Sequence, residues 1–224
     1  MTGAKEYRVH RTGGTRAVEL NWDSYPWQTV EPGVLSHFMG HRPDHFPETA
    51  FKAVFDATRL HLLFMVRDRF VVARRTRYQD QVCDDSCVEF FFYPGDSTGS
   101  GYFNLEINCC GAFLFRFQKA RDTDVVAVSS MDASLVRIVT SLGPGRIDPE
   151  IQVPLTWSVL VSLPFSVIGR YVPLVEDPVV WRANMYKCAD RSSHPHWLTW
   201  SPVPGPGPDF HRSGSFGRFV FEQD

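Results

Sequence analysis

Apolar and polar residues alternate along most of the chain, and a period of two residues is typical of β-strands. In residues 60–66, for example, Leu60, Leu62, Phe64 and Val66 would share one face of a strand. Turn-forming residues interrupt the apolar runs at short intervals. The pattern predicts strands over residues 7–9, 51–55, 60–66, 86–93, 102–108, 112–118, 134–142, 147–153, 157–163, 180–188 and 216–221, and one helical turn over 164–169.

So many short strands and so little helix predict an all-β fold, an antiparallel β-sandwich of jelly-roll type. Residues 1–50 are rich in proline and loops, so we expect an extended N-terminal arm packed on a sandwich core formed by residues 51–224. The proline-rich residues 202–208 lie between two aromatic segments, which favours a rigid loop over a domain boundary. A chain of 224 residues suits one all-β domain, so we expect residues 1–224 to form a single domain.

Residues 94–101 (Pro-Gly-Asp-Ser-Thr-Gly-Ser-Gly) consist of turn formers and predict a hairpin between the strands on either side. If Tyr93 pairs with Tyr102, the apolar side chains of both strands share the core face. The opposite face then carries Glu89, Phe91, Tyr93, Tyr102, Asn104, Glu106 and Asn108. This register predicts a polar face with aromatic rings, two carboxylates and two amides.

Such a face suits a saccharide, whose hydroxyls need carboxylate and amide partners and whose C–H faces pack on aromatic rings. The alternative is the ordinary solvated face of an antiparallel sheet, which also alternates polar with apolar residues. An ordinary face would favour Lys, Thr and Ser over Glu and Asn. The composition therefore favours a binding surface.

The same register places Glu89 directly opposite Glu106, where two negative charges repel each other. A basic partner, a bound cation or a shared proton would compensate. The strand over 180–188 carries Arg182 and Asn184 on one face, and we expect Arg182 to lie beside the two carboxylates.

A second group of aromatic and polar side chains gathers near the C-terminus and includes Trp197, Trp200, His211 and Arg212. A flat sheet face needs walls to become a pocket. We expect these loops to fold over the polar face of the hairpin, with Trp200 as a stacking surface. The alternative is that both tryptophans close the end of the sandwich as core residues.

Charge and cysteine content narrow the class of protein. A formal net charge of −2 and a pI near 6.4 argue against a nucleic-acid partner. No apolar run approaches the length of about 18 residues that a membrane-spanning helix needs, so no membrane partner is expected. The 5 cysteines are an odd number, and the first residues lack a signal-peptide pattern, so we expect a cytoplasmic protein, or a secreted one if a leader has been lost.

Five phrases in this order resemble the family 9 carbohydrate-binding modules and related bacterial proteins. They are Asp-Ser-Cys-Val-Glu-Phe-Phe (85–91), Tyr-Phe-Asn-Leu-Glu-Ile-Asn (102–108), Trp-Arg-Ala-Asn-Met-Tyr-Lys-Cys (181–188), Trp-Leu-Thr-Trp-Ser-Pro (197–202) and Asp-Phe-His-Arg (209–212) before Phe-Gly (216–217). The resemblance implies a jelly-roll-like sandwich related to DOMON domains. It also implies a sugar chain end held between two tryptophan rings by Glu, Asn, Gln and Arg side chains, and structural calcium.

Carried over by position, the resemblance gives Glu89 the role of a hydroxyl acceptor and lets Trp197 or Trp200 supply one ring of the clamp. This chain departs from the family pattern before its acidic strand. Residues 81–83 (Gln-Val-Cys) stand where the other clamp tryptophan is expected.

Two functions follow from these residues. A non-catalytic module would bind a small saccharide or related polyol without turnover. The alternative is a glycoside hydrolase or lyase that uses Glu89 and Glu106, because two carboxyl groups about 5 Å apart match a retaining mechanism. A substrate must fit between acid and nucleophile, however, and one flat sheet face offers no such gap. We therefore expect the binding module.

Overall fold

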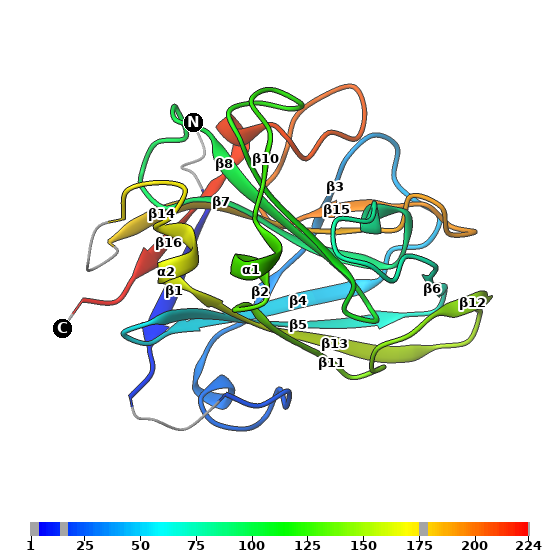
Figure 1. The fold of residues 1–224 in the computed structure, drawn as a ribbon. Coiled ribbons are helices and arrows are strands. Elements are labelled where there is room, and N and C mark those ends of the chain that lie inside the picture. Colours follow the sequence, from blue (N-terminus) through cyan, green and yellow to red (C-terminus); the bar gives the residue numbers. More distant parts are fainter. Residues whose placement is uncertain (1–4, 14–17, 175–178, 224) are drawn as a thin grey trace.

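In the computed structural model, the described residues are 5–13, 18–174 and 179–223. Strands dominate the chain (Figure 1), as the alternating pattern predicts. They are β1 (Glu6–Arg11), β2 (Gly33–Val34), β3 (His37–Phe38), β4 (Glu48–Phe55), β5 (Arg59–Asp68), β6 (Val71–Ala73), β7 (Cys87–Tyr93), β8 (Tyr102–Asn108), β9 (Phe113–Gln118), β10 (Val126–Ala127), β11 (Arg137–Thr140), β12 (Ile147–Ile151), β13 (Leu155–Pro164), β14 (Val180–Cys188), β15 (Trp197–Thr199) and β16 (Gly217–Phe221). The helices described are α1 (Ser130–Ala133), α2 (Phe165–Ile168) and the 3-10 turns Trp27–Thr29, Val82–Asp84 and Ser213–Ser215.

Apart from β6 and β12, which pair as a separate two-stranded sheet, the strands form two layers that face each other (Figure 1). One layer has the order β10-β9-β8-β7-β14-β16, with β15 and β3 attached through β14, and the other has the order β4-β5-β13-β11, with β2 on β4. Strand β1 joins the layers because its first half pairs with β16 and its second half with β4. Both β1 pairings are parallel, whereas the other ladders between these strands are antiparallel. The predicted all-β sandwich is confirmed.

The core lies between the layers and consists of the apolar side chains that alternate along each strand. Phe90, Phe92 and Phe103 of the first layer and Leu62 and Phe64 of the second are almost completely buried in one cluster. Phe92 stacks on Phe103 with ring centroids 5.0 Å apart. The period-two pattern therefore assigns the core faces of β5, β7 and β8 correctly, and this fixes which side chains point away from the core.

The structure also differs from the sequence expectation in places. Residues 134–142 were expected to be one strand, but the strand there, β11, covers only Arg137–Thr140, and the unpredicted helix α1 ends just before this range. The hydroxyl of Ser129 accepts a hydrogen bond from the backbone N–H of Asp132 at 3.1 Å and caps this helix. Strand β6 was missed because three residues are too few to show a period. In the N-terminal segment, β1 is part of the sheets.

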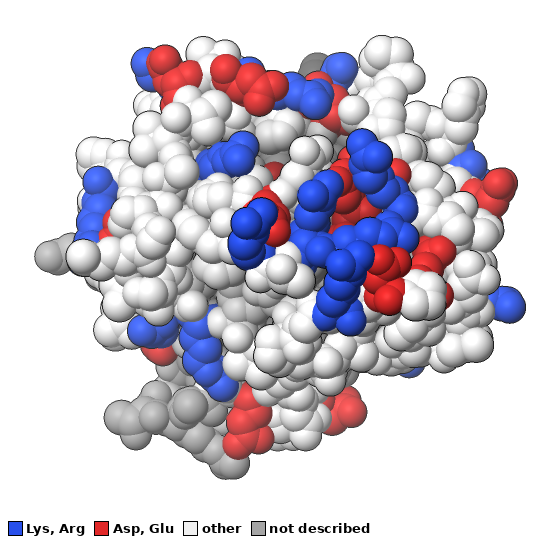
Figure 2. Space-filling model, turned by 45° about the vertical axis from the view of Figure 1, so that its right-hand side comes forward, with Lys and Arg blue, Asp and Glu red and all other residues white. Residues whose placement is uncertain are grey.

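The surface in Figure 2 shows basic and acidic side chains mixed on one face. Several arginines between residues 67 and 77 have acidic partners. Arg74 lies 3.4 Å from Asp148, and Arg75 pairs with Asp84. Among the described residues, no helix is both long and apolar enough to cross a bilayer.

Candidate functional site

The hairpin of β7 and β8 has the register that the sequence predicts. Glu89 pairs with Glu106, and Phe91 pairs with Asn104. Because neighbouring side chains directly opposite on antiparallel strands point to the same face, the two glutamates lie side by side. Their Cβ atoms are about 4.5–5.5 Å apart in such a pair.

The polar face of this hairpin is covered rather than solvated. A second apolar cluster lies on it, formed by side chains of the sheet together with Val203, Phe210 and Phe216 from the C-terminal loop. Phe210 stacks on Tyr186 with ring centroids 4.1 Å apart. Tyr186 also donates a hydrogen bond to the backbone carbonyl of Phe210 at 3.1 Å. The loop thus covers this face of the sheet, as the expected wall of a pocket would.

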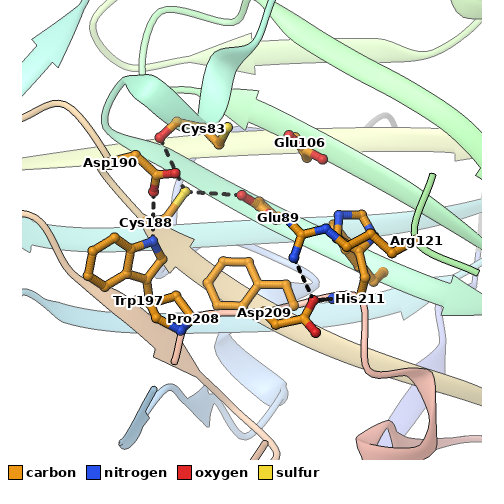
Figure 3. A pocket seen from close by; sticks show the side chains of 12 residues that line it. Cys83, Glu89, Glu106, Arg121, Cys188, Asp190, Trp197, Pro208, Asp209 and His211 are labelled. Carbon is orange, nitrogen blue, oxygen red and sulfur yellow. Dashed lines mark hydrogen bonds and ion pairs between the residues drawn. The ribbon is translucent and has the colours of Figure 1, made fainter. Parts of the chain in front are cut away.

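A cavity of about 310 Å³ remains between this loop and the sheet (Figure 3). It is lined by Cys83, Glu89, Phe91, Glu106, Arg121, Cys188, Asp190, Trp197, Pro208, Asp209, Phe210 and His211. The lining residues are spread along the chain from Cys83 to His211. The cavity combines aromatic rings with acidic side chains, and we take it as the candidate functional site.

Glu89 and Glu106 form the acidic floor of the cavity. Burial raises the pKa of Glu89 well above its usual value, and the nearby Glu106 raises it further. Burial also raises the pKa of Glu106 to about 7, although a hydrogen bond from Asn104 and the charge of Arg116 oppose this change. Burial and mutual repulsion therefore favour a proton on the pair, which is one of the three compensations that the sequence suggested.

Each of these carboxyl groups accepts one hydrogen bond among the described residues. The Asn104 side-chain amide donates to Oε1 of Glu106 at 2.8 Å, and the thiol of Cys188 donates to Oε1 of Glu89 at 3.0 Å. The second oxygen of each group has no protein partner in the part of the chain that the structure describes. Because both residues line the cavity, their second oxygens are unpaired acceptors beside it.

Trp197 and Asp190 form one wall. The indole Nε1 of Trp197 donates a hydrogen bond to Oδ1 of Asp190 at 2.8 Å. Trp197 stands at the start of β15, opposite Cys188 on β14, so its half-buried ring borders the cavity. Burial raises the pKa of Asp190 to about 6, while the bond from Trp197 acts in the opposite direction.

His211 lies at the other end of the cavity, as Figure 3 shows. Its Nδ1 lies 2.8 Å from the hydroxyl of Tyr102 and 3.1 Å from the side-chain amide nitrogen of Gln118. Gln118 also donates to Asn104 at 3.0 Å, which connects His211 to Glu106 through amide side chains. Burial lowers the pKa of His211 to about 4, so the ring is neutral at pH 7. With Nδ1 as acceptor, the proton sits on Nε2 and is available as a donor.

Arg121 and Asp209 form the rim beside His211. Arg121 donates to Oδ1 of Asp209 at 3.2 Å, and Arg212 donates to Oδ2 of the same carboxylate at 3.1 Å. Arg212 also donates to the backbone carbonyl of Pro204. Arg212, which was expected in the binding patch, is not part of the lining and instead holds Asp209 and the loop in place.

Of the other residues expected at the site, three hold backbone or side chains in place. Asn104 orients Glu106 from beneath, as described above. Asn108 donates to Asp85 and to the backbone carbonyl of Arg75, and it accepts from two backbone N–H groups of the turn after β8. Asn184 exchanges hydrogen bonds with the backbone of Ser201 at 3.0 and 2.8 Å. Neither Asn108 nor Asn184 lines the cavity.

The expectation that Arg182 lies beside the glutamates is wrong. Arg182 pairs with Tyr93 at the other end of the β7–β14 ladder, whereas Tyr186 is the residue opposite Glu89. Its guanidinium donates to the backbone carbonyl of Phe216. Four residues along a strand span about 13 Å, which is too far for a direct ion pair.

The expectation that Trp200 offers a stacking surface is also wrong. Only 1% of Trp200 is exposed, and it belongs to the core cluster between the sheets. Its ring meets Phe51 and Phe219 edge-on, at 5.8 and 5.6 Å between centroids. The alternative reading, a structural tryptophan, holds for Trp200 but not for Trp197.

One set of metal-ligating side chains lies close together in the described part of the chain: Cys87, Glu89 and Cys188, with ligand atoms within 4.8 Å of one another. Calcium prefers six to eight oxygen ligands, and two of these three groups are thiols. The group therefore does not fit the calcium that the resemblance implies. Burial raises the pKa of both thiols, and the thiol of Cys188 already donates to Glu89, so the three groups are paired as they stand.

The sequence matches the family model of carbohydrate-binding family 9 over residues 19–221. The chain belongs to this family. Its structure is similar to that of a predicted carbohydrate-binding protein from Bacteroides uniformis ATCC 8492, with a TM-score of 0.87, 26% sequence identity and coverage of 98% of this chain and 100% of the other. No curated protein matches the sequence significantly.

Two further structures share the fold. Both are of a family 9 carbohydrate-binding module from Caldicellulosiruptor kristjanssonii. The complex with cellotriose has a TM-score of 0.65 and 13% identity, and covers 98% of this chain and 95% of the other. The complex with glucose has a TM-score of 0.64 and 12% identity, and covers 97% and 96%.

Within the carbohydrate-binding family 9 fold, the segment where a clamp tryptophan was expected contributes Cys83 to the cavity lining. Its thiol has no flat face on which a sugar ring could stack. The aromatic residues of the lining are Phe91, Trp197 and Phe210. Phe210 was not predicted as a site residue. It lies in a loop and reaches the cavity only because this loop folds back onto the sheet.

Proposed function

We propose that this member of carbohydrate-binding family 9 binds the end of a small saccharide in the cavity bordered by Trp197 and floored by Glu89 and Glu106. The observation that carries the proposal is the combination of open carboxyl oxygens with a partly exposed indole in one cavity. Carboxyl oxygens accept hydrogen bonds from sugar hydroxyls, and an indole face packs against sugar C–H groups. Glucose and cellotriose, found in complexes of the Caldicellulosiruptor module, are the first ligands to test.

The proposed binding involves no turnover. Glu89 and Glu106 extend from neighbouring positions on one sheet, so they approach a ligand from the same side. A retaining glycosidase needs its two carboxyl groups on either side of the scissile bond. Recovery of unchanged cellotriose after prolonged incubation with the protein would agree with this. Release of glucose would favour the hydrolase alternative.

The Trp197→Ala variant is expected to bind glucose or cellotriose about tenfold more weakly, because a lost stacking contact of roughly 1.4 kcal/mol corresponds to that factor. Isothermal titration calorimetry measures this directly. The Trp197→Phe variant keeps an aromatic ring but loses the bond to Asp190, so it separates stacking from the orientation of Asp190.

A matched control is Trp22→Ala, because Trp22 is also half-buried but packs on Lys52 away from the cavity. This variant should bind as the parent does. Equal binding by the parent and a folded Trp197→Ala protein would reject this cavity as the saccharide site.

A further inference from the structure

The cavity contains more acidic groups than basic partners for them. Its lining has the four carboxyl groups of Glu89, Glu106, Asp190 and Asp209, but Arg121 is its one residue with a fixed positive charge. Arg121 already bonds Asp209 at the rim and lies 3.8 Å from Asp122. The remaining three carboxyl groups therefore face the cavity without an ion-pair partner in the described chain.

The other cations nearby are directed elsewhere. Lys187 lies on the opposite side of β14, where its fully buried ammonium is 2.7 Å from His196 and 3.5 Å from Asp68. Arg116, opposite Asn104 on β9, donates through Nε to the side chain of Gln79 at 3.1 Å. His211 is neutral, as described above. Neither of these cations forms an ion pair with Glu89 or Glu106.

We propose that the saccharide held by this cavity carries a free amine, and that Glu89 and Glu106 bind its ammonium group. This inference rests on the proposed function, because it names the class of saccharide for the same cavity. An ammonium group has three N–H donors, and the open oxygens of Glu89, Glu106 and Asp190 are three acceptors in one lining. Burial of the two glutamates against each other costs least when a positive charge lies between them.

An ammonium group fits these surroundings better than a hard metal ion does. Calcium or magnesium would need a nearly complete shell of oxygen ligands, whereas the thiols of Cys83 and Cys188 occupy part of the lining next to Glu89. The indole of Trp197 and the phenyl rings of the lining also suit an organic cation, because their faces attract positive charge. The rest of the sugar ring would pack on these aromatic surfaces.

The test compares glucose with glucose analogues that carry a free amine at C2, C3 or C6, by isothermal titration calorimetry of the whole protein at pH 7. At least one amine analogue should bind about tenfold or more tightly than glucose, which corresponds to one buried charge-assisted hydrogen-bond pair. N-Acetylglucosamine, which has lost the amine charge, should show no such gain.

Two variants and a control variant test whether the preference for the amine depends on Glu89 and Glu106. Glu89→Gln and Glu106→Gln keep the shape of the side chain, and each should reduce the affinity ratio of amine analogue to glucose to about twofold or less. Glu48→Gln removes an exposed carboxylate on the other sheet, which pairs with Arg67, and should leave the preference unchanged.

The outcomes separate the two proposals. If glucose binds and none of the amine analogues binds more tightly, the inference is overturned and the proposed function stands. The same holds if the preference survives in both glutamine variants. If neither glucose, cellotriose nor any amine analogue binds, both the inference and the proposed function fall.

Discussion

The Trp200→Ala variant is expected to lose about 3–5 kcal/mol of unfolding free energy, the usual cost of truncating a fully buried aromatic side chain. The ring of Trp200 lies among Tyr7, Phe51 and Phe219, and almost none of it reaches solvent. Gly217 adds to this packing, since a Cβ atom there would lie 2.5 Å from the indole ring. Urea unfolding followed by circular dichroism measures the loss.

The two tryptophans provide a comparison within one short segment, β15 and the residue after it. Trp197→Ala removes a half-buried ring at the cavity and should cost much less stability than Trp200→Ala. Trp200→Phe retains part of the packing and should fall between the parent and the alanine variant. If Trp200→Ala were as stable as Trp197→Ala, the placement of Trp200 in the core would be contradicted.

The sequence predicts the sheet parts of the site well because they follow from a local rule. A loop of turn formers fixes the register of β7 and β8, and the period of two then decides which side chains point away from the core. Glu89, Phe91 and Glu106 are found on the expected face for this reason. The sequence spacing is enough to predict which side chains share a face when the two strands are neighbours in a hairpin.

Other parts of the site depend on how distant segments pair, and the spacing of residues within one segment does not determine this pairing. Arg182 and Asn184 share a face with Tyr186, but how far β14 is shifted along β7 decides which of them meets Glu89. A shift of four residues exchanges Arg182 for Tyr186. Likewise, Trp197 and Trp200 are three residues apart and point to opposite sides of their layer, one to the cavity and one to the core.

Residues that line the cavity from single loop positions were missed altogether. Cys83, Asp190 and Asp209 have no periodic pattern around them and reach the site only when β14 and the C-terminal loop are in place. A signal for Asp190 was nevertheless present, since it lies two residues after the end of β14 at Cys188, and β14 was correctly predicted. Because β14 pairs with β7, which carries Glu89, an acidic residue just after β14 was a candidate for a third carboxyl group of the site.

The buried acid pair predicts how stability depends on pH. The pKa of Glu106 is about 7 in the folded protein against the usual 4.5, so the folded state keeps its proton to higher pH than the unfolded state. The stability linked to this proton is fully present below about pH 4.5 and is lost as the pH rises through about 7. Each pH unit of separation corresponds to about 1.4 kcal/mol, so Glu106 alone accounts for about 3 kcal/mol.

Neighbouring groups change the total profile, so the test uses a difference between two proteins. Burial also raises the pKa of Glu89 and Asp190, which act in the same direction as Glu106, whereas the lowered pKa of His211 acts in the opposite direction. The Glu106→Gln variant cannot bind or release this proton but can still accept the bond from Asn104. Relative to the parent, it should gain about 3 kcal/mol or more between pH 4.5 and pH 8 in urea unfolding, because the loss of Glu106 also removes one cause of the raised pKa of Glu89.

The Glu48→Gln variant tests whether any lost carboxylate has this effect. Glu48 is exposed and pairs with Arg67 on the surface, where an ion pair contributes little. Its profile should run parallel to that of the parent. A Glu106→Gln profile that also ran parallel to the parent from pH 4.5 to pH 8 would mean that Glu106 stays ionised in the folded protein, and that a cation or solvent reaches it without any ligand.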